Sequence, residues 1–475
     1  MHDLRTRALA ALCFTALPFC AVGQEVDIPV TARKGLDLTI YESDLALIKD
    51  RRALRPPRAE ATFAFSGVSA HMRPETALLS VLDGAPWEIV EQTFDFNVAS
   101  PQTLLERSVG QEVTILTMNP ATGRETSERA KVLSIEDEPL FEIAGKIHSQ
   151  IPGRVVFDKI PAGLRPTPAL LVTAKADPSR EALMELSYLS GGLSWRADYV
   201  AEFDSESNRL DLAAWATVTN TTGVDFKDAK VKLVSGALNR IAPQPMMKAA
   251  RGDSLTAMAA AAPAPGVQRQ ELGGYHLYDV ARPVSLGNNQ TKQLALLDGS
   301  GLKAKKEYLV RGEVYFYNSQ VPGRTTPAQA EQAITFKNDA DAGFGLPLPA
   351  GSLRVYGQDA SGASQFLGED ALVHTPQGGE VRIDIGRDFD VTFEREQTSF
   401  VRASDRITLV AWKVTLKNAK TKPVGVRVIE PLAGSWEITR ESHSRVASNA
   451  NMAEWLLDVP AKGQTVLEYT AKIEY

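Results

Sequence analysis

Cysteine is nearly absent from this sequence. The only two cysteines, Cys13 and Cys20, lie within the first 23 residues. A chain from which that segment is removed has no thiol, which excludes disulfide bonds, a thiolate nucleophile and thiolate metal ligands. We therefore expect a fold held by packing alone. The length of 475 residues allows this, because larger chains bury a greater fraction of their surface.

Clustered charge is also missing. The formal net charge is −6, and no run of five like charges occurs, so we expect neither nucleic-acid binding nor a polybasic membrane patch. After the N-terminal segment no apolar run reaches the ~20 residues of a transmembrane helix. The hydrophobic content of 44% is that of a soluble globular protein. The length predicts about three domains.

Motifs of common enzymes and cofactor sites are absent too. The sequence has no GxSxG, GxGxxG, GxxxxGK[ST] or HExxH pattern. Ser190-Gly191-Gly192 resembles a phosphate-binding loop only in composition, and we interpret it as a hairpin turn. We assign no catalytic, cofactor-binding or metal-binding residue and no cofactor. The histidines after the N-terminal segment also lack the spacing of metal ligands: His71, His148, His276, His374 and His443.

The first 23 residues predict a secretory signal peptide. Arg5 precedes an apolar stretch from Ala8 to Val22, and Ala21-Val22-Gly23 supplies the small residues of a cleavage site. A membrane anchor is the alternative, but the apolar run is short and is interrupted by Pro18. A lipid anchor on Cys20 is not expected, because small residues do not precede it. We expect a periplasmic or secreted protein whose signal is cleaved near Gly23.

Alternating apolar residues predict a mainly β fold. Between Leu183 and Arg240 the pattern predicts four consecutive strands. In the second of them, Trp195, Tyr199 and Phe203 share one face with small residues, as in a half-buried strand. We predict antiparallel β-sandwich units, a small SH3-like barrel inserted between them, and a C-terminal immunoglobulin-like sandwich.

The predicted barrel insertion begins with a helix from Ser100 to Arg107. Ser100 is a suitable N-cap and Pro101 suits the first helical position. Farther along, residues 243–271 are rich in alanine and proline and predict a flexible linker. The full prediction is a signal peptide at 1–23, N-terminal strands at 24–99, the insertion at 100–157, a central β-meander at 158–242, the linker at 243–271, the continuation of the central domain at 272–399, and the C-terminal sandwich at 400–475.

Two polar groups are candidates for function. Arg196, Asp198, Glu202 and Asp204 lie on one strand, and a carboxylate there paired with one from another strand is suited to glycoside hydrolysis. The alternative is a solvated face with an Arg–Asp pair. The second group is a basic cluster, which we interpret as protection of a sheet edge rather than an anion site: Lys303, Lys305 and Lys306.

Three predicted strands end in the same way. Asn220, Asn338 and Asn418 each close a strand and precede a turn. Shared turn chemistry is the interpretation we favour, since asparagine tolerates left-handed backbone angles and can bond to its own turn. The alternative is a set of sandwich units of one type.

Several stretches carry a resemblance to a known family: YLSGGLSWRADYVAEFD, TNTTGVDFKDAKVKLVSG, YHLYDVARPVSLGNNQTKQL, LPLPAGSLRVY, FLGEDALVHTP and VIEPLAGSWEI. From about Leu36 to Tyr475 the chain resembles a bacterial family of exported proteins of unknown function, related to the C-terminal part of mucoidy inhibitor A. The resemblance implies an exported, β-rich envelope protein and supplies no catalytic residue. The relative's name points to capsule or exopolysaccharide.

We therefore expect an exported, non-enzymatic β-sandwich protein that binds an envelope protein or polysaccharide. A glycan-active hydrolase using paired carboxylates and a structural surface or matrix component are the alternatives. An open cleft with two carboxylates and aromatic walls would favour the hydrolase. A flat or edge-exposed apolar patch would favour the binding protein.

Overall fold

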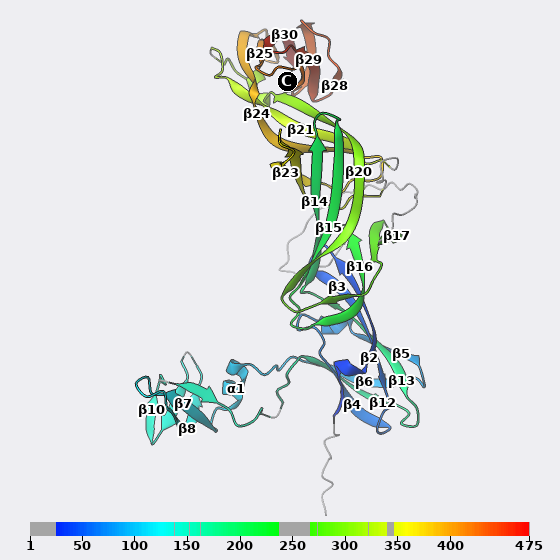
Figure 1. Ribbon diagram of the computed structural model, residues 1–475, viewed down its shortest axis with the longest axis vertical. Coiled ribbons are helices and arrows are strands. Elements are labelled where there is room, and N and C mark those ends of the chain that lie inside the picture. Colours follow the sequence, from blue (N-terminus) through cyan, green and yellow to red (C-terminus); the bar gives the residue numbers. More distant parts are fainter. Residues whose placement is uncertain are drawn as a thin grey trace, which may run out of the picture. The chain divides into compact units, whose positions relative to one another are not determined.

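The computed structural model describes residues 25–136, 138–151, 153–161, 163–236, 267–272, 274–321, 323–339 and 346–474 (Figure 1). Strands dominate these residues, so the predicted mainly β fold is confirmed. None of the helices described is both long and apolar enough to cross a membrane. The predicted signal peptide and residues 243–266 of the predicted linker lie outside the described residues. Val267 to Glu271, at the end of the linker range, belong to a strand.

The elements have the following bounds: β1 (Val26–Ile28), η1 (Val30–Ala32), β2 (Arg33–Tyr41), β3 (Leu45–Leu54), β4 (Glu60–Ser66), η2 (Pro74–Thr76), β5 (Leu78–Asp83), β6 (Glu88–Asp95), α1 (Pro101–Arg107), β7 (Glu112–Met118), β8 (Glu125–Ser134), β9 (Leu140–Ile143), β10 (Lys146–His148), β11 (Arg154–Val156), β12 (Ala169–Lys175), β13 (Ala182–Ser190), β14 (Leu193–Asp204), β15 (Arg209–Asn220), β16 (Phe226–Ser235), β17 (Val267–Leu272), β18 (Tyr275–Val280), β19 (Val284–Leu286), β20 (Gln290–Arg311), η3 (Val314–Tyr317), β21 (Ala328–Lys337), β22 (Gly351–Gln358), β23 (Ser364–Leu372), β24 (Glu380–Arg402), β25 (Ile407–Asn418), β26 (Val424–Pro431), β27 (Ser435–Glu441), β28 (Ala447–Asn449), β29 (Met452–Val459) and β30 (Gly463–Glu474).

The chain divides into two compact units. The first contains the residues up to Asp37, Leu47–Gly191 and Thr222–Phe226, and the second contains Leu38–Ala46, Gly192–Thr221 and the residues from Lys227 onward. In the first unit β1, β4, β12 and β6 form one sheet in that order. Cross-strand pairs such as Phe65 with Leu170 place large apolar side chains in its buried layer.

The inserted segment forms an open sheet. Ser100 Oγ accepts a hydrogen bond from Thr103 N at 3.1 Å and caps α1, which confirms the predicted helix. The strands then follow the order β10-β9-β8-β7-β11 around a small core that includes Val113, Val132 and Phe141. They do not close into the expected SH3-like barrel. The two outer strands, β10 and β11, are only three residues long, which is too short to join the edges.

The predicted four-strand meander is wrong in its pairing, although all four strands exist. β13 lies beside β5, β14 pairs with β15, and β16 lies in another sheet beside β18. The reason is burial, because consecutive strands in facing sheets can pack their apolar faces against each other. In the second unit the ring of Trp195 of β14 packs against the ring of Tyr278 of β18, with 6.2 Å between ring centroids. Its Nε1 donates to Val234 O of β16 at 3.1 Å.

One connection recurs in the second unit. β14 pairs antiparallel with β15, β20 with β21, and β24 with β25. The strand that follows a hairpin does not pair with that hairpin. It crosses over to the first strand of the hairpin before it in the sequence. Thus β22 runs parallel to β14, and β26 runs parallel to β20. β16, which follows β15, lies beside β2 in the sheet order. The second unit is therefore built from sandwich elements of one type.

The three strand-closing asparagines lie at these crossovers. Asn220, Asn338 and Asn418 are at most 2% exposed. Their Nδ2 groups donate to Gly287 O at 3.1 Å, Pro376 O at 3.0 Å and Pro460 O at 3.2 Å, each shortly before the next strand of the large sheet. None of the three has a positive φ. Their recurrence therefore reflects buried side-chain hydrogen bonds in a repeated unit, and not tolerance of left-handed backbone angles.

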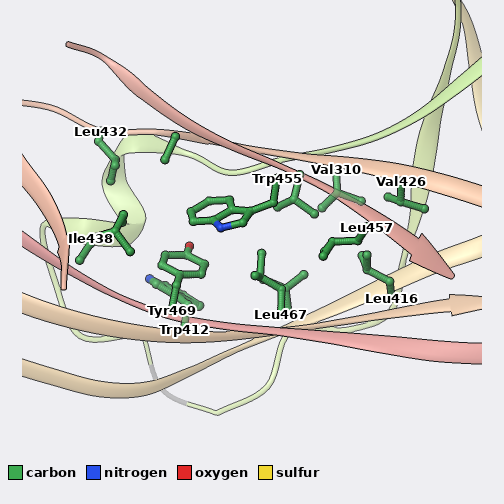
Figure 2. Close-up of a cluster of buried hydrophobic side chains, with 14 of the residues drawn as sticks. Val310, Trp412, Leu416, Val426, Leu432, Ile438, Trp455, Leu457, Leu467 and Tyr469 are labelled. Carbon is green, nitrogen blue, oxygen red and sulfur yellow. The ribbon is translucent and has the colours of Figure 1, made fainter. Parts of the chain in front are cut away.

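The C-terminal part of the second unit has the aromatic core of a sandwich (Figure 2). Trp455 of β29 stacks on Tyr469 of β30 with 4.9 Å between ring centroids, and Trp412 of β25 lies opposite Tyr469. The faces predicted from alternation are buried, including Val414 and Leu467. The core also draws on Val310 and other residues before position 400.

Candidate functional site

Strand β14 has one face in the core and one face outward. Trp195, Tyr199 and Phe203 are at most 3% exposed, which confirms the predicted inward face. The opposite face includes Arg196, whose side chain is 68% exposed, and Val200, which is 40% exposed. Because residues opposite each other in paired strands share a face, this outer face continues over β15, β22 and β23.

Asp198 lies on the outer face and forms the predicted Arg–Asp pair with Arg196, but it is itself only 6% exposed. Its carboxylate accepts hydrogen bonds from Thr217 Oγ1 at 2.6 Å, Arg196 Nε at 3.2 Å and Arg354 Nη1 at 3.4 Å. Burial raises the pKa of Asp198. The hydrogen bond from Thr217 and the two arginines outweigh that effect and place this pKa below its ordinary value. The carboxylate is therefore held ionised.

The other two carboxylates of the set also have partners. Glu202 Oε1 accepts a hydrogen bond from Gln358 Nε2 at 3.1 Å. Asp204 Oδ1 accepts from Glu206 N at 2.8 Å and Asp204 Oδ2 from Ser207 Oγ at 2.5 Å, so Asp204 stabilises the turn after β14. Residues two apart on a strand are ~7 Å apart, so Asp198 and Glu202 are separated by roughly twice that distance. The structure does not bring these carboxylates together.

The outer face carries an apolar stripe that sequence reasoning missed. We define the stripe as Trp215 of β15, Val200 of β14, Tyr356 of β22 and Phe366 of β23. Trp215 is 39% exposed and Phe366 is 56% exposed, and the rings of Tyr356 and Phe366 are 5.6 Å apart. A signal was available for the first two residues, because Val200 and Trp215 are apolar at positions where their strands alternate to the polar side.

Edge protection by the basic cluster stays a prediction, because the described pairs of Lys305 and Lys306 are with β21, whereas the pairs of β20 with β15 end at Lys303 and those with β26 begin at Tyr308. β20, which carries it, lies between β15 and β21 in the sheet order. Lys305 Nζ pairs with Glu307 Oε1 at 3.3 Å, and Lys303 is exposed. Lys306 is partly buried over the ring of Tyr308, and burial lowers its pKa.

Lys306 also lines a cavity of about 670 Å³ beneath the turns after β14 and β22. Asp204, Glu206 and Asp359 lie around this cavity. Hydrogen bonds from Ser361, Gln365 and neighbouring amides lower the pKa of Asp359 to about 2. Two of these carboxylates thus serve their own turns, and the cavity as a whole is acidic.

Histidine places no metal site in the described residues, where no group of three or more potential metal ligands occurs. His374 is the histidine with the most defined surroundings. Its Nδ1 accepts a hydrogen bond from Ala350 N at 3.1 Å and lies 3.3 Å from Ser235 Oγ. Its Nε2 is 3.8 Å from Glu42 Oε2. Ser235 is the last residue of β16 and is 2% exposed, whereas the His374 side chain is 52% exposed, so this contact joins the end of β16 to the segment after β23.

The comparison with protein families bears on the same part of the chain. Residues 184–475, which include the whole outer face, match the family described as Domain of unknown function (DUF4139). The chain belongs to this family. No curated protein matches it. In this DUF4139 protein Asp198 is ion-paired, Glu202 accepts a hydrogen bond from Gln358 and Asp204 stabilises a turn, and the exposed apolar stripe lies among them.

Proposed function

We propose that this DUF4139 protein is an exported, non-enzymatic protein that binds a component of the cell envelope through the outer face of β14, β15, β22 and β23. The observation that carries the proposal is the stripe of Trp215, Val200, Tyr356 and Phe366 on an open sheet face. Large apolar side chains that align on a surface and are flanked by polar groups are typical of interaction sites. No described helix or strand covers them.

The chemistry of the face supports binding over hydrolysis. A glycosidase needs one carboxyl group that is protonated and a second one placed across the scissile bond. Asp198 is held ionised by Thr217, Arg196 and Arg354. Glu202 lies four residues farther along β14, which is roughly 14 Å away.

The N-terminal sequence and the family resemblance support the proposed location. The signal-peptide pattern of residues 1–23 favours export to the periplasm. The relation to the C-terminal part of mucoidy inhibitor A belongs to the same proposal, because that name points to capsule or exopolysaccharide. An exported protein related to such a factor would meet envelope components first.

The test follows the protein in its native cells. Wild-type protein should sediment with the envelope fraction, and the double variant Trp215→Ala, Phe366→Ala should move to the soluble fraction. Phe389→Ala is the matched control, because Phe389 is 83% exposed on β24, outside the stripe. Phe389→Ala should keep the wild-type melting temperature, since an exposed side chain contributes little to stability, and the double variant is compared at a temperature at which it is folded, because Trp215 is only 39% exposed. Equal retention of the double variant would refute the proposal.

A further inference from the structure

We infer that the component bound by this face is an uncharged polysaccharide that lies diagonally across β15, β14, β22 and β23. The inference rests on the proposed function and names its ligand class. It is carried by the spacing of the stripe, by the polar groups between its members, and by the charge of the face.

The stripe is diagonal because of the strand register. Trp215 lies opposite Asp198, and Val200 is the next residue of β14 on the same face. Tyr356 lies opposite Glu202, the next outward residue after Val200, and Phe366 lies directly opposite Tyr356. The first two steps each cross one strand and advance two residues, which places neighbouring members roughly 8 Å apart at their backbones.

Polar groups fill the positions on either side of the stripe. Arg354 Nε contacts Glu369 Oε2 at 3.2 Å on one side, and the Glu202–Gln358 hydrogen bond lies on the other. A sugar ring has an apolar face of C–H groups, which packs on an aromatic ring, and a rim of hydroxyl groups. Hydroxyl groups both donate and accept hydrogen bonds, so they can bond to a carboxylate, an amide or a guanidinium. A chain of sugars repeats these two features along its length, as the stripe does.

A protein partner fits this face less well. The centre of a protein–protein interface is depleted of charged residues and binds through clustered anchors in a desolvated pocket. Here charged side chains stand beside every member of the stripe, and a protein covering the face would have to desolvate them. A polysaccharide leaves such groups hydrogen-bonded to hydroxyls and water.

The charge of the face selects among polysaccharides. Its carboxylates outnumber its guanidinium groups, with Asp198, Glu202, Asp204, Asp211 and Glu369 against Arg196, Arg209 and Arg354. Asp198 is itself saturated by its two arginines. A polyanion such as a polyuronate would therefore meet an excess of negative charge on this face, which weakens binding. An uncharged chain meets no such repulsion.

The face is organised before a ligand arrives. The stripe residues stand on strands rather than loops, and the edge-to-face contact of Tyr356 with Phe366 fixes both rings. Ion pairs hold Arg354 between Asp198 and Glu369. Fewer rotamers remain to be frozen, so more of the contact energy appears as affinity.

The test is affinity electrophoresis of the purified full-length mature protein. The gels contain hydroxyethyl cellulose, galactomannan, glycol chitin as an N-acetylated chain, or polygalacturonate as the charged comparison. At least one of the first three should retard the wild-type protein more than polygalacturonate does. Trp215→Ala and Phe366→Ala should each weaken that retardation about fivefold or more. Trp215→Phe, which keeps an aromatic ring, should retain most of it, and Phe389→Ala should leave it unchanged.

The outcomes separate this inference from the proposed function. If no uncharged polysaccharide retards the wild-type protein while envelope retention still depends on Trp215 and Phe366, the ligand class is wrong and the binding face stands. If retardation is strong but insensitive to both alanine variants, the glycan lies elsewhere and the inference fails. Preference for polygalacturonate would overturn the argument from charge. Loss of the wild-type melting temperature would disqualify Trp215→Ala, and Phe366→Ala, at a side chain that is 56% exposed, then decides in its place.

Discussion

Replacing Asn418 by alanine should destabilise the C-terminal sandwich by about 3 kcal/mol. The Asn418 amide donates to Lys422 O at 2.9 Å, Pro460 O at 3.2 Å and Val459 O at 3.3 Å, and its Oδ1 accepts from Lys420 N at 2.9 Å. Two N–H groups and one carbonyl are thus satisfied, and each such bond contributes ~1 kcal/mol net. Asn418 is only 2% exposed, so water cannot readily replace them, and the loss could reach ~5 kcal/mol.

Asn418→Asp separates the hydrogen-bond argument from packing. Aspartate has the same shape but directs a charged acceptor at carbonyl oxygens, so it should cost at least as much as alanine near neutral pH. Urea unfolding followed by tryptophan fluorescence, to which Trp412 and Trp455 of this core contribute, measures both losses. Asn449→Ala is the matched control, because Asn449 closes an exposed turn. A loss below ~0.5 kcal/mol for Asn418→Ala, or tolerance of aspartate, would refute the role assigned to this side chain.

Four further outcomes are expected. Trp195→Ala should cost ~3–5 kcal/mol in chemical denaturation and Arg196→Ala under ~1 kcal/mol, and similar small losses would contradict the strand's orientation. The lowered pKa of Asp198 means that its stabilising effect is present above about pH 4, its unfolded value, and is lost as pH falls through the native pKa. Asp198→Asn should therefore be destabilised at pH 7 and approach wild type in acid, and an equal gap at both pH values would count against the ion pairs. Mass spectrometry of the native protein should show an N-terminus near Gln24, and an intact Met1 in the cytoplasm would contradict export. Replacing residues 243–266, which end before β17, by a short Gly/Ser linker should leave the melting temperature nearly unchanged, and a large drop would mean that the segment packs against the fold.

The alternation of side chains predicted most strands and their buried faces. In β14 the inward residues Trp195, Tyr199 and Phe203 were identified from period two alone, because burial of one face imposes that period. The helix after Ser100 was predicted for an equally local reason, since a capping residue and a following proline act within one turn. Local patterns of this kind need no knowledge of the partner strand.

Pairing between distant segments was not predictable from those patterns. Asp198 was expected on a solvated face, and its burial depends on Arg354 of β22, which is 156 residues away in sequence. The stripe has the same origin, since Tyr356 and Phe366 join Trp215 only through the parallel pairing of β14 with β22. The predicted meander was wrong because its pairing also depends on segments that are distant in sequence. Short strands of similar composition do not specify which sheet they enter.

The crossover that brings β22 beside β14 also connects fold to function. β22 supplies Arg354 and Tyr356 to the face, and it reaches β14 only because the chain crosses over after β21. Asn338 stands at the start of that crossover, where its amide holds Leu346 O at 2.8 Å and Pro376 O at 3.0 Å. The proposed binding face is thus composite, built from the β14–β15 hairpin and from β22, with β23 beside it. Such a surface exists only when β22 has paired with β14, so on the proposed function a variant with a damaged crossover should lose binding while most of its strands remain.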